Sequence, residues 1–385
     1  MSDRSSSRTI PEPSDATTAV LLTPGPLTTS AATRRAMLRD WGSRNADFIA
    51  LTARLRARLT ELANAADTHV CVPIQGSGTF AVEAMIGTLV PADGKLLIPV
   101  NGAYGKRMEK ICGVIGRPFR VIESPEDRPV EPDVIDAALA ADPSISHVAA
   151  IHCETTSGVL NPLERIAAVV AGRSRALLVD AMSTFGALAI DARECPFEAL
   201  AASANKCIEG VPGVGFVLAR PEALAARAGN APSLSLDLHD QWRGLEANGQ
   251  WRFTPPTHVL AAFDAALDQL DAEGGTAGRL ARYSDNCRRL VAGMRELGFE
   301  TLLDDADQAP IIVTFMTPGD PKFDFTRFYD SLHGRGYVIY PGKITEADTF
   351  RIGCIGAIGA VEIDGALAAI EATLDEMAVR DRGPR

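Results

Sequence analysis

The sequence lacks the cysteine pattern of a disulfide-stapled or zinc-stabilised protein. Its seven cysteines are scattered, odd in number and free of Cys-x-x-Cys spacing, which argues against a disulfide framework and a structural metal site. No apolar run approaches the roughly 20 residues that a helix needs to cross a bilayer. Residues 1–18 also lack the apolar core of a secretory signal. We therefore expect a flexible leader at 1–18 on a cytoplasmic protein that has reduced thiols and no membrane attachment.

Positive charge is also scarce. The chain carries 38 Lys and Arg against 49 Asp and Glu, a net charge of -11. Because phosphate backbones are held mainly by clustered cations, we expect no nucleic-acid partner. A small anionic ligand would have to be held locally, by one or two arginines and by helix N-termini.

Apolar runs of strand length are plentiful, and they alternate with amphipathic stretches of helical spacing. The runs cover 70–74, 96–100, 147–151, 176–180 and 214–219. This alternation predicts an α/β fold with a mainly parallel sheet covered by helices.

A domain boundary is expected at the turn Glu273-Gly274-Gly275, which precedes a long helical stripe that ends near Gly298. Beyond it, short strands are expected at 301–303, 311–315, 337–340 and 350–352. We thus predict a large domain over 19–272 and a smaller C-terminal α+β domain over 273–385. The segment near 19–30 is expected to pack with the smaller domain.

The segment Gly76-Ser77-Gly78-Thr79 follows an expected strand and opens an expected helix. Small residues there expose backbone N–H groups at a positive helix terminus, which favours a phosphate site. A plain tight turn is an equal alternative. With Ala81 the segment also fits the dinucleotide fingerprint G-x-G-x-x-A, but that site needs an acid about 20 positions on. The sequence there is Val100-Asn101-Gly102, so an oxidoreductase of this kind is disfavoured.

Three isolated polar residues complete the candidate site. Asp180 ends an apolar strand, and its alternative role is a helix N-cap beside Ser183 and Thr184. Lys206 is one of only six lysines against 32 arginines, and among charged residues only lysine can form an imine. Arg351 lies inside an apolar strand, where a guanidinium needs an anion, either a ligand or a structural carboxylate.

Taken together, these parts are the ones that pyridoxal 5'-phosphate (PLP) chemistry requires, because the acid keeps the pyridine nitrogen protonated and the lysine forms the imine. From Leu21 to about Leu374 the chain resembles the class V aminotransferases of PLP fold type I. The segments that carry the resemblance are 22–29, 75–79, 101–105, 154–158, 179–183, 203–208, 233–238, 251–258, 340–343 and 350–353. The resemblance implies PLP as cofactor and a large domain with a seven-stranded sheet.

The resemblance also implies a role for each matching residue. Lys206 and Asp180 are the implied catalytic residues. The implied cofactor-binding residues are Ser77, Gly78, Thr79, Tyr104, Thr155, Asp180, Asn205, Lys206 and Thr254. Arg351 and Gly25 are the implied substrate-binding residues. No metal is implied.

Within the family, the runs near Ser233, Trp251 and Tyr340 resemble the group of enzymes that move the amine of 2-aminoethylphosphonate to pyruvate. The reaction implied is ping-pong, giving phosphonoacetaldehyde and L-alanine in phosphonate catabolism. Alanine:glyoxylate or serine:pyruvate transamination stays as the alternative, and a catalytically silent binding protein is a further one. The resemblance also implies a homodimer with shared active sites, in which Thr254 reaches the partner's cofactor.

Overall fold

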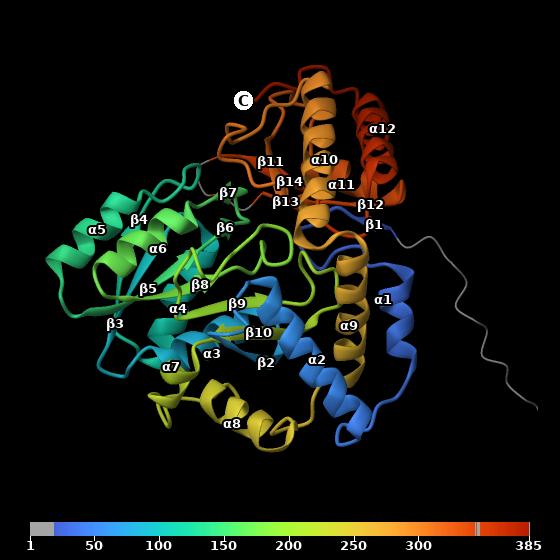
Figure 1. Ribbon diagram of the computed structural model, residues 1–385. Helices are drawn as coiled ribbons and strands as arrows, with labels where there is room; N and C mark the ends of the chain where they lie inside the picture. Colours follow the sequence, from blue (N-terminus) through green and yellow to red (C-terminus); the bar gives the residue numbers. More distant parts are fainter. Residues whose placement is uncertain (1–18, 343, 345–346, 385) are drawn as a thin grey trace, which may run out of the picture.

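The computed structural model describes residues 19–342, 344 and 347–384. The leader expected at 1–18 and Lys343 lie outside the described residues. Figure 1 shows a large part built on one central sheet and a smaller C-terminal part above it. No helix of the described chain combines the length and the apolar character that a membrane crossing demands.

The central sheet has seven strands, which confirms the expected α/β fold with a mainly parallel sheet. In spatial order they are β2 (Val70–Gly76), β10 (Gly213–Ala219), β9 (Ala199–Ser203), β8 (Ala176–Asp180), β5 (Ile145–Ile151), β3 (Lys95–Val100) and β4 (Phe119–Glu123). All the paired strands run parallel except β10, which is antiparallel to both of its neighbours. Only residues 204–212 join β9 to β10, a connection without a helix, so the chain turns straight back.

Helices cover both faces of this sheet. One face carries α3 (Gly78–Leu89), α4 (Ala103–Ile115), α7 (Pro221–Ala225) and α8 (Leu238–Asn248). The other carries α2 (Ala46–Leu62), α5 (Pro132–Ala141), α6 (Leu163–Gly172) and α9 (Thr257–Ala272), while α1 (Ala31–Arg35) and the short 3-10 turn Ala36–Leu38 pack on α9. Strands buried on both faces explain the unbroken apolar runs of the sequence.

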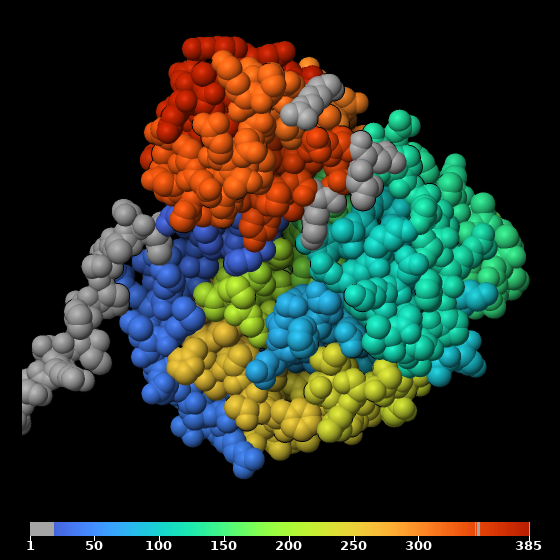
Figure 2. Space-filling view, turned by 180° about the vertical axis from the view of Figure 1, so that it is seen from behind, coloured from blue at the N-terminus to red at the C-terminus, as the bar shows by residue number. Residues whose placement is uncertain are grey.

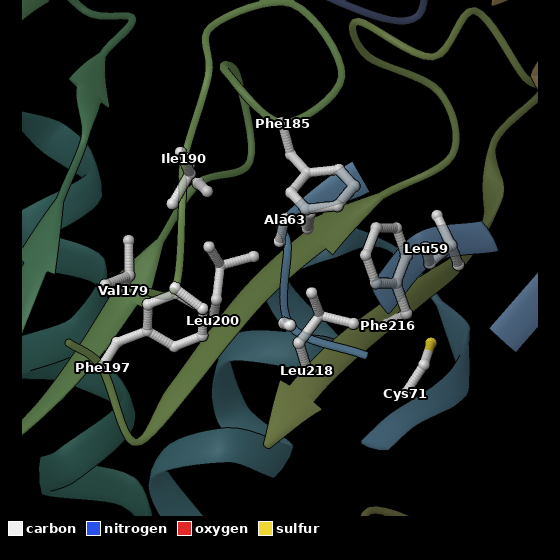
Figure 3. Close-up of a cluster of buried hydrophobic side chains, with 14 of the residues drawn as sticks. Leu59, Ala63, Cys71, Val179, Phe185, Ile190, Phe197, Leu200, Phe216 and Leu218 are labelled. Atoms are coloured by element: carbon white, nitrogen blue, oxygen red, sulfur yellow. The ribbon is translucent and has the colours of Figure 1, made fainter. Parts of the chain in front are cut away.

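The core between β8–β10 and α2 is dense. Figure 3 shows Phe216 beside Leu59 of α2, and Phe185 beside Ala63. The rings of Phe185 and Phe216 meet edge to face, with centroids 5.2 Å apart. This rigid layer supports the loops that follow β8 and β9.

The C-terminal part contains α10 (Gly275–Glu296), β11 (Ile312–Met316), α11 (Phe325–Gly334), β12 (Tyr337–Val338), β13 (Tyr340–Pro341), β14 (Thr349–Gly353) and α12 (Ala360–Met377). Its three-stranded antiparallel sheet has the order β11-β14-β13. The N-terminal strand β1 (Val20–Leu21) pairs in parallel with β12. A small hairpin, β6 (Cys153–Glu154) with β7 (Val159–Leu160), lies at the edge of the large sheet.

Two sequence expectations were wrong in detail. The strand expected at 301–303 is a single bridge from Thr301 to Phe315, because a turn at 304–307 ends the pairing. The strand expected at 337–340 splits between two sheets, as β12 and β13. The edge strand β4 was missed, since its half-exposed side chains give no continuous apolar run.

Candidate active site

Four candidate segments meet at the carboxyl edge of the central sheet. Ser77 follows β2, Tyr104 follows β3, Asp180 ends β8 and Lys206 follows β9. Because these strands point the same way, the residues after them gather at one edge, where α/β proteins bind ligands. In Figure 2 the blue N-terminal residues, the yellow-green segment near residue 200 and the orange C-terminal part meet on one face.

The start of α3 has the features of an anion cradle. Ser77 is its N-cap residue but makes no side-chain capping hydrogen bond, so its hydroxyl and the first-turn N–H groups can serve a ligand. Gly78 is buried, and a Cβ at this position would collide with Sδ of Met182. A side chain at this position would therefore require Met182 to move.

Lys206 is held by backbone oxygens of the N-terminal loop. Its Nζ donates to the carbonyl oxygens of Pro24 (2.6 Å) and Gly25 (3.3 Å). A Cβ on Gly25, whose φ is +110°, would lie 2.7 Å from Cδ of Lys206. No carboxylate of the described residues pairs with this amine. Burial lowers the pKa of Lys206, which raises the share of the neutral amine, the form that attacks an aldehyde.

Asp180 is a buried carboxylate with one neutral donor. Its Oδ1 accepts the backbone N–H of Met182 at 2.9 Å. Turns, and no helix, follow it, so the N-cap interpretation is wrong. Burial raises the pKa of Asp180 to about 6, although the Met182 N–H and the charges of Arg107 and Lys206 oppose this shift. A cationic partner beside this carboxylate would remove the cost of its charge.

Arg351 projects from β14 of the C-terminal part toward the same edge. Its guanidinium donates to the carbonyl oxygens of Thr155 (Nη1, 2.8 Å) and Pro341 (Nε, 3.0 Å) and lies 5.8 Å from the ring centroid of Tyr340. Only 4% of the residue is exposed, and burial lowers the pKa of Arg351. Among the described residues no carboxylate forms an ion pair with it, so this part of the chain gives no support to the structural salt-bridge interpretation.

The remaining predicted residues divide between this cluster and the surface. The backbone oxygen of Asn205 lies beside Gly25, and Thr155 is buried next to Arg351. Thr254, by contrast, is exposed and lines a separate groove of about 510 Å³ with Gly76, Phe80, Trp251 and Phe253 among others.

Sequence reasoning did not assign a role to Glu154. This carboxylate of β6 is fully buried beside the start of α4. Its Oε2 accepts the N–H of Tyr104 at 3.1 Å, and its Oε1 accepts the N–H of Thr156 at 3.0 Å. Burial raises its pKa, while these hydrogen bonds oppose the shift. Glu154 therefore fixes the position of Tyr104. The available signal was its location next to Thr155, three residues after the predicted strand 147–151.

Comparison with known proteins decides the family. The aminotransferase class-V family matches residues 28–331. The chain belongs to the class-V aminotransferases. It is 59% identical over 361 residues to 2-aminoethylphosphonate–pyruvate transaminase 2 of Burkholderia lata, covering 94% of this chain and 96% of that one. It is 57% identical over 362 residues to 2-aminoethylphosphonate–pyruvate transaminase of Pseudomonas fluorescens, covering 94% and 98%.

Solved structures of this class-V aminotransferase's relatives share its fold. An alanine–glyoxylate aminotransferase from Nostoc sp. superposes with a TM-score of 0.87 at 22% identity, covering 97% of this chain and 100% of that one. A pyridoxamine-pyruvate aminotransferase from Mesorhizobium loti superposes with a TM-score of 0.86 at 23% identity, covering 96% of this chain and 95% of that one. At these identities the likeness concerns the fold alone.

Class-V aminotransferases use PLP, and the donor set of this chain fits that cofactor. A cradle for a phosphate, an amine with a lowered pKa and a buried carboxylate that lacks a cation lie along one edge. Between the cradle and Asp180 is a cavity of about 30 Å³, lined by Gly78, Thr79, Val82, Tyr104, Arg107, Met108, Asp180 and Met182. This space holds about one water molecule. Flexible side chains such as Met182 border it, and these adapt at low cost.

Proposed function

We propose that this class-V aminotransferase transfers the amine of 2-aminoethylphosphonate to pyruvate, giving phosphonoacetaldehyde and L-alanine. The names of the relatives at 57–59% identity support this substrate pair. The structural observation that carries the proposal is Arg351, a buried guanidinium that faces Thr155 and has no carboxylate partner among the described residues.

Arg351 supplies the anion site that both substrates need. The amino donor carries no carboxylate on its reacting carbon, so its phosphonate is its only strong handle. A planar guanidinium can donate two parallel hydrogen bonds to phosphonate or carboxylate oxygens. The same residue can therefore orient the phosphonate in one half-reaction and the carboxylate of pyruvate in the other.

PLP, when bound, supplies an electron-withdrawing ring that stores the amine between the two half-reactions. The chain supplies the acid–base groups. The amine of Lys206 removes a proton from the carbon that bears the substrate's amine and returns it in the reverse half-reaction. The carbonyls of Pro24 and Gly25 accept the hydrogens of this amine when it is protonated. A protonated ring nitrogen beside Asp180 would offset the cost of its buried negative charge and keep it ionised.

A substrate screen on the purified protein tests the reaction. We expect 2-aminoethylphosphonate with pyruvate to give an aldehyde and alanine with a kcat/KM well above that for alanine with glyoxylate or serine with pyruvate. A protein that uses either amino-acid pair and leaves 2-aminoethylphosphonate unchanged would replace the proposal with the alternative.

We further propose a cytoplasmic homodimer with shared active sites and a domain division at 272/273. The exposed groove at Thr254 contains the half-exposed aromatic rings of Phe80 and Phe253, a composition that suits a self-complementary interface. Gly76 of the phosphate cradle lines the same groove, which supports a contact between Thr254 and the cofactor of the partner.

Seven buried, unpaired cysteines suit a reducing compartment.

Complementation tests the shared site. An inactive Lys206→Ala chain is mixed with an inactive Thr254→Glu chain under conditions that exchange subunits. One site of each mixed dimer then has native Lys206 and native Thr254 only when the two come from different chains. We expect activity to return. Mixed dimers that stay inactive, or a fully active monomer, would contradict the shared site.

A further inference from the structure

Arg107 lies among the predicted cofactor-binding residues, although neither its sequence context nor the mechanism above assigns it a role. It is half-buried on α4, one helical turn after Tyr104. Its Nη1 donates to Oγ1 of Thr79 at 3.2 Å, and its guanidinium carbon lies 4.5 Å from the ring centroid of Tyr104. Within the described chain no carboxylate forms an ion pair with it. Arg107 is thus a cation directed at the cofactor site.

The hydrogen bond to Thr79 has a chemical consequence. A hydroxyl has one hydrogen to donate and lone pairs that accept. Because Arg107 supplies a hydrogen to the oxygen of Thr79, the hydroxyl hydrogen of Thr79 remains for another acceptor. When two hydrogen bonds follow one another, a charged donor in the first also strengthens the second. Thr79 lies in the first turn of α3, so an anion at the start of this helix is the matching acceptor.

We propose that Arg107 is a positioning residue for the phosphate of PLP, which acts by directing the hydroxyl of Thr79 toward the phosphate and by adding positive charge beside the cradle. The inference rests on the cofactor assignment above. The contact with Tyr104 holds the guanidinium in place, because cation and ring attract one another. The cradle itself contains no charged side chain: Ser77, Gly78 and Thr79 are neutral. Arg107 therefore supplies positive charge that the cradle residues lack.

Cofactor binding with and without its phosphate tests this role. Apo forms of the native chain and of Arg107→Gln are titrated with PLP and with pyridoxal, which lacks the phosphate, and binding is followed by absorbance near 400 nm. We expect Arg107→Gln to raise the Kd of PLP about tenfold, the value of one charge-assisted hydrogen bond. The Kd of pyridoxal should change less than about twofold by the same arithmetic. Lys110→Gln removes an exposed cation from the same helix and should leave both constants unchanged.

A second variant separates positioning from general destabilisation. Thr79→Val keeps the shape of the side chain but removes the hydroxyl, and we expect the same phosphate-specific loss. In the double variant the combined loss should be smaller than the sum of the two single losses, because part of the effect of Arg107 passes through Thr79. If Arg107→Gln does not fold, as judged by its thermal midpoint, Arg107→Lys takes its place in this cycle.

The possible outcomes test the cofactor assignment and the role of Arg107 separately. A native chain that binds no PLP would refute both. If the native chain binds PLP, three results would overturn the role of Arg107 alone. These are equal losses of affinity for PLP and pyridoxal, no loss in Arg107→Gln, and losses that add in full in the double variant.

Discussion

Two groups of buried charges lie close together in this protein and differ in how they are paired. In the first, the carboxylate of Glu209 accepts hydrogen bonds from Arg282 (2.8 Å) and from the hydroxyl of Tyr283 (2.6 Å). Glu273 accepts from both Arg282 (2.7 Å) and Arg279 (2.7 Å). Every charge of this group, which we name the Glu209 network, therefore has an opposite charge in contact. The network joins the loop after Lys206 to α10.

The second group is Lys206, Asp180 and Arg351, whose hydrogen-bond partners among the described residues are backbone groups. Burial without an opposite charge shifts the pKa of each toward its neutral form. Paired buried charges hold a fold together, whereas unpaired ones cost stability and point to a ligand. The comparison predicts that substitutions in the two groups have opposite effects on stability and function.

Lys206→Ala should have the largest effect. We expect transamination to fall by at least about 10⁴-fold, since imine formation and proton transfer use the same amine. The thermal midpoint of the apo form should not fall, because the variant removes a buried amine that has no carboxylate partner. Rate measurements and a thermal scan check both statements, with Lys110→Ala as the exposed control. Near-normal turnover of a folded variant would contradict the assignment.

Glu209→Gln should do the reverse and act mainly on stability. Removing this charge leaves the half-buried guanidinium of Arg282 and the buried guanidinium of Arg279 with one carboxylate fewer, and breaking a buried pair costs about 3 kcal/mol. Denaturant unfolding of the apo form measures the loss. The surface pair of Asp136 with Arg173 provides the control, since Asp136→Asn should leave the unfolding midpoint nearly unchanged. Equal midpoints for the two variants would show that the Glu209 network is not structural.

Asp180→Asn should separate function from stability in one residue. The folded apo form holds its proton with a pKa of about 6 against 3.8 for an ordinary aspartate. Stability from this group is full below pH 3.8 and is lost as the pH rises through 6, so at neutral pH the ionised side chain is a penalty. We therefore expect the apo variant to unfold at the same or a higher temperature at pH 7, with a gain that shrinks toward pH 4. Activity should fall about 100-fold, since a neutral amide stabilises a cationic ring poorly. A variant with full activity would leave Asp180 without its proposed role.

Much of the fold could be predicted because burial on both faces leaves a clear pattern. The apolar runs at 176–180 and 214–219 coincide with β8 and nearly with β10. The edge strand β4 could not be found this way, since its side chains are half-exposed or exposed. The bridge at Thr301 depends on its partner Phe315 and on the turn at 304–307. The residues 301–303 alone reveal neither.

The candidate site was predictable where chemistry demands one residue type and harder where it depends on tertiary contacts. Lys206 is conspicuous because lysine is rare in this chain. Arg107 has no such distinction, and its contact with Thr79 spans 28 positions. Its spacing of three residues from Tyr104 on one helix was the only local signal.

Arg351→Lys is expected to have the smallest effect, because it keeps the charge and changes only the shape of the donor. An ammonium cannot reproduce two parallel hydrogen bonds, so we expect kcat/KM to fall about tenfold to 100-fold. This range equals about 1.4 to 2.7 kcal/mol, which is typical of a hydrogen bond to a charged group. Both half-reactions should weaken alike if the phosphonate and the carboxylate of pyruvate use this site in turn. Single-turnover rates with 2-aminoethylphosphonate, and then with pyruvate, measure the two halves. Arg335→Lys, on the exposed surface, is the control. If the pyruvate half alone weakens, the phosphonate is held elsewhere, and Lys343 is the first residue to substitute next.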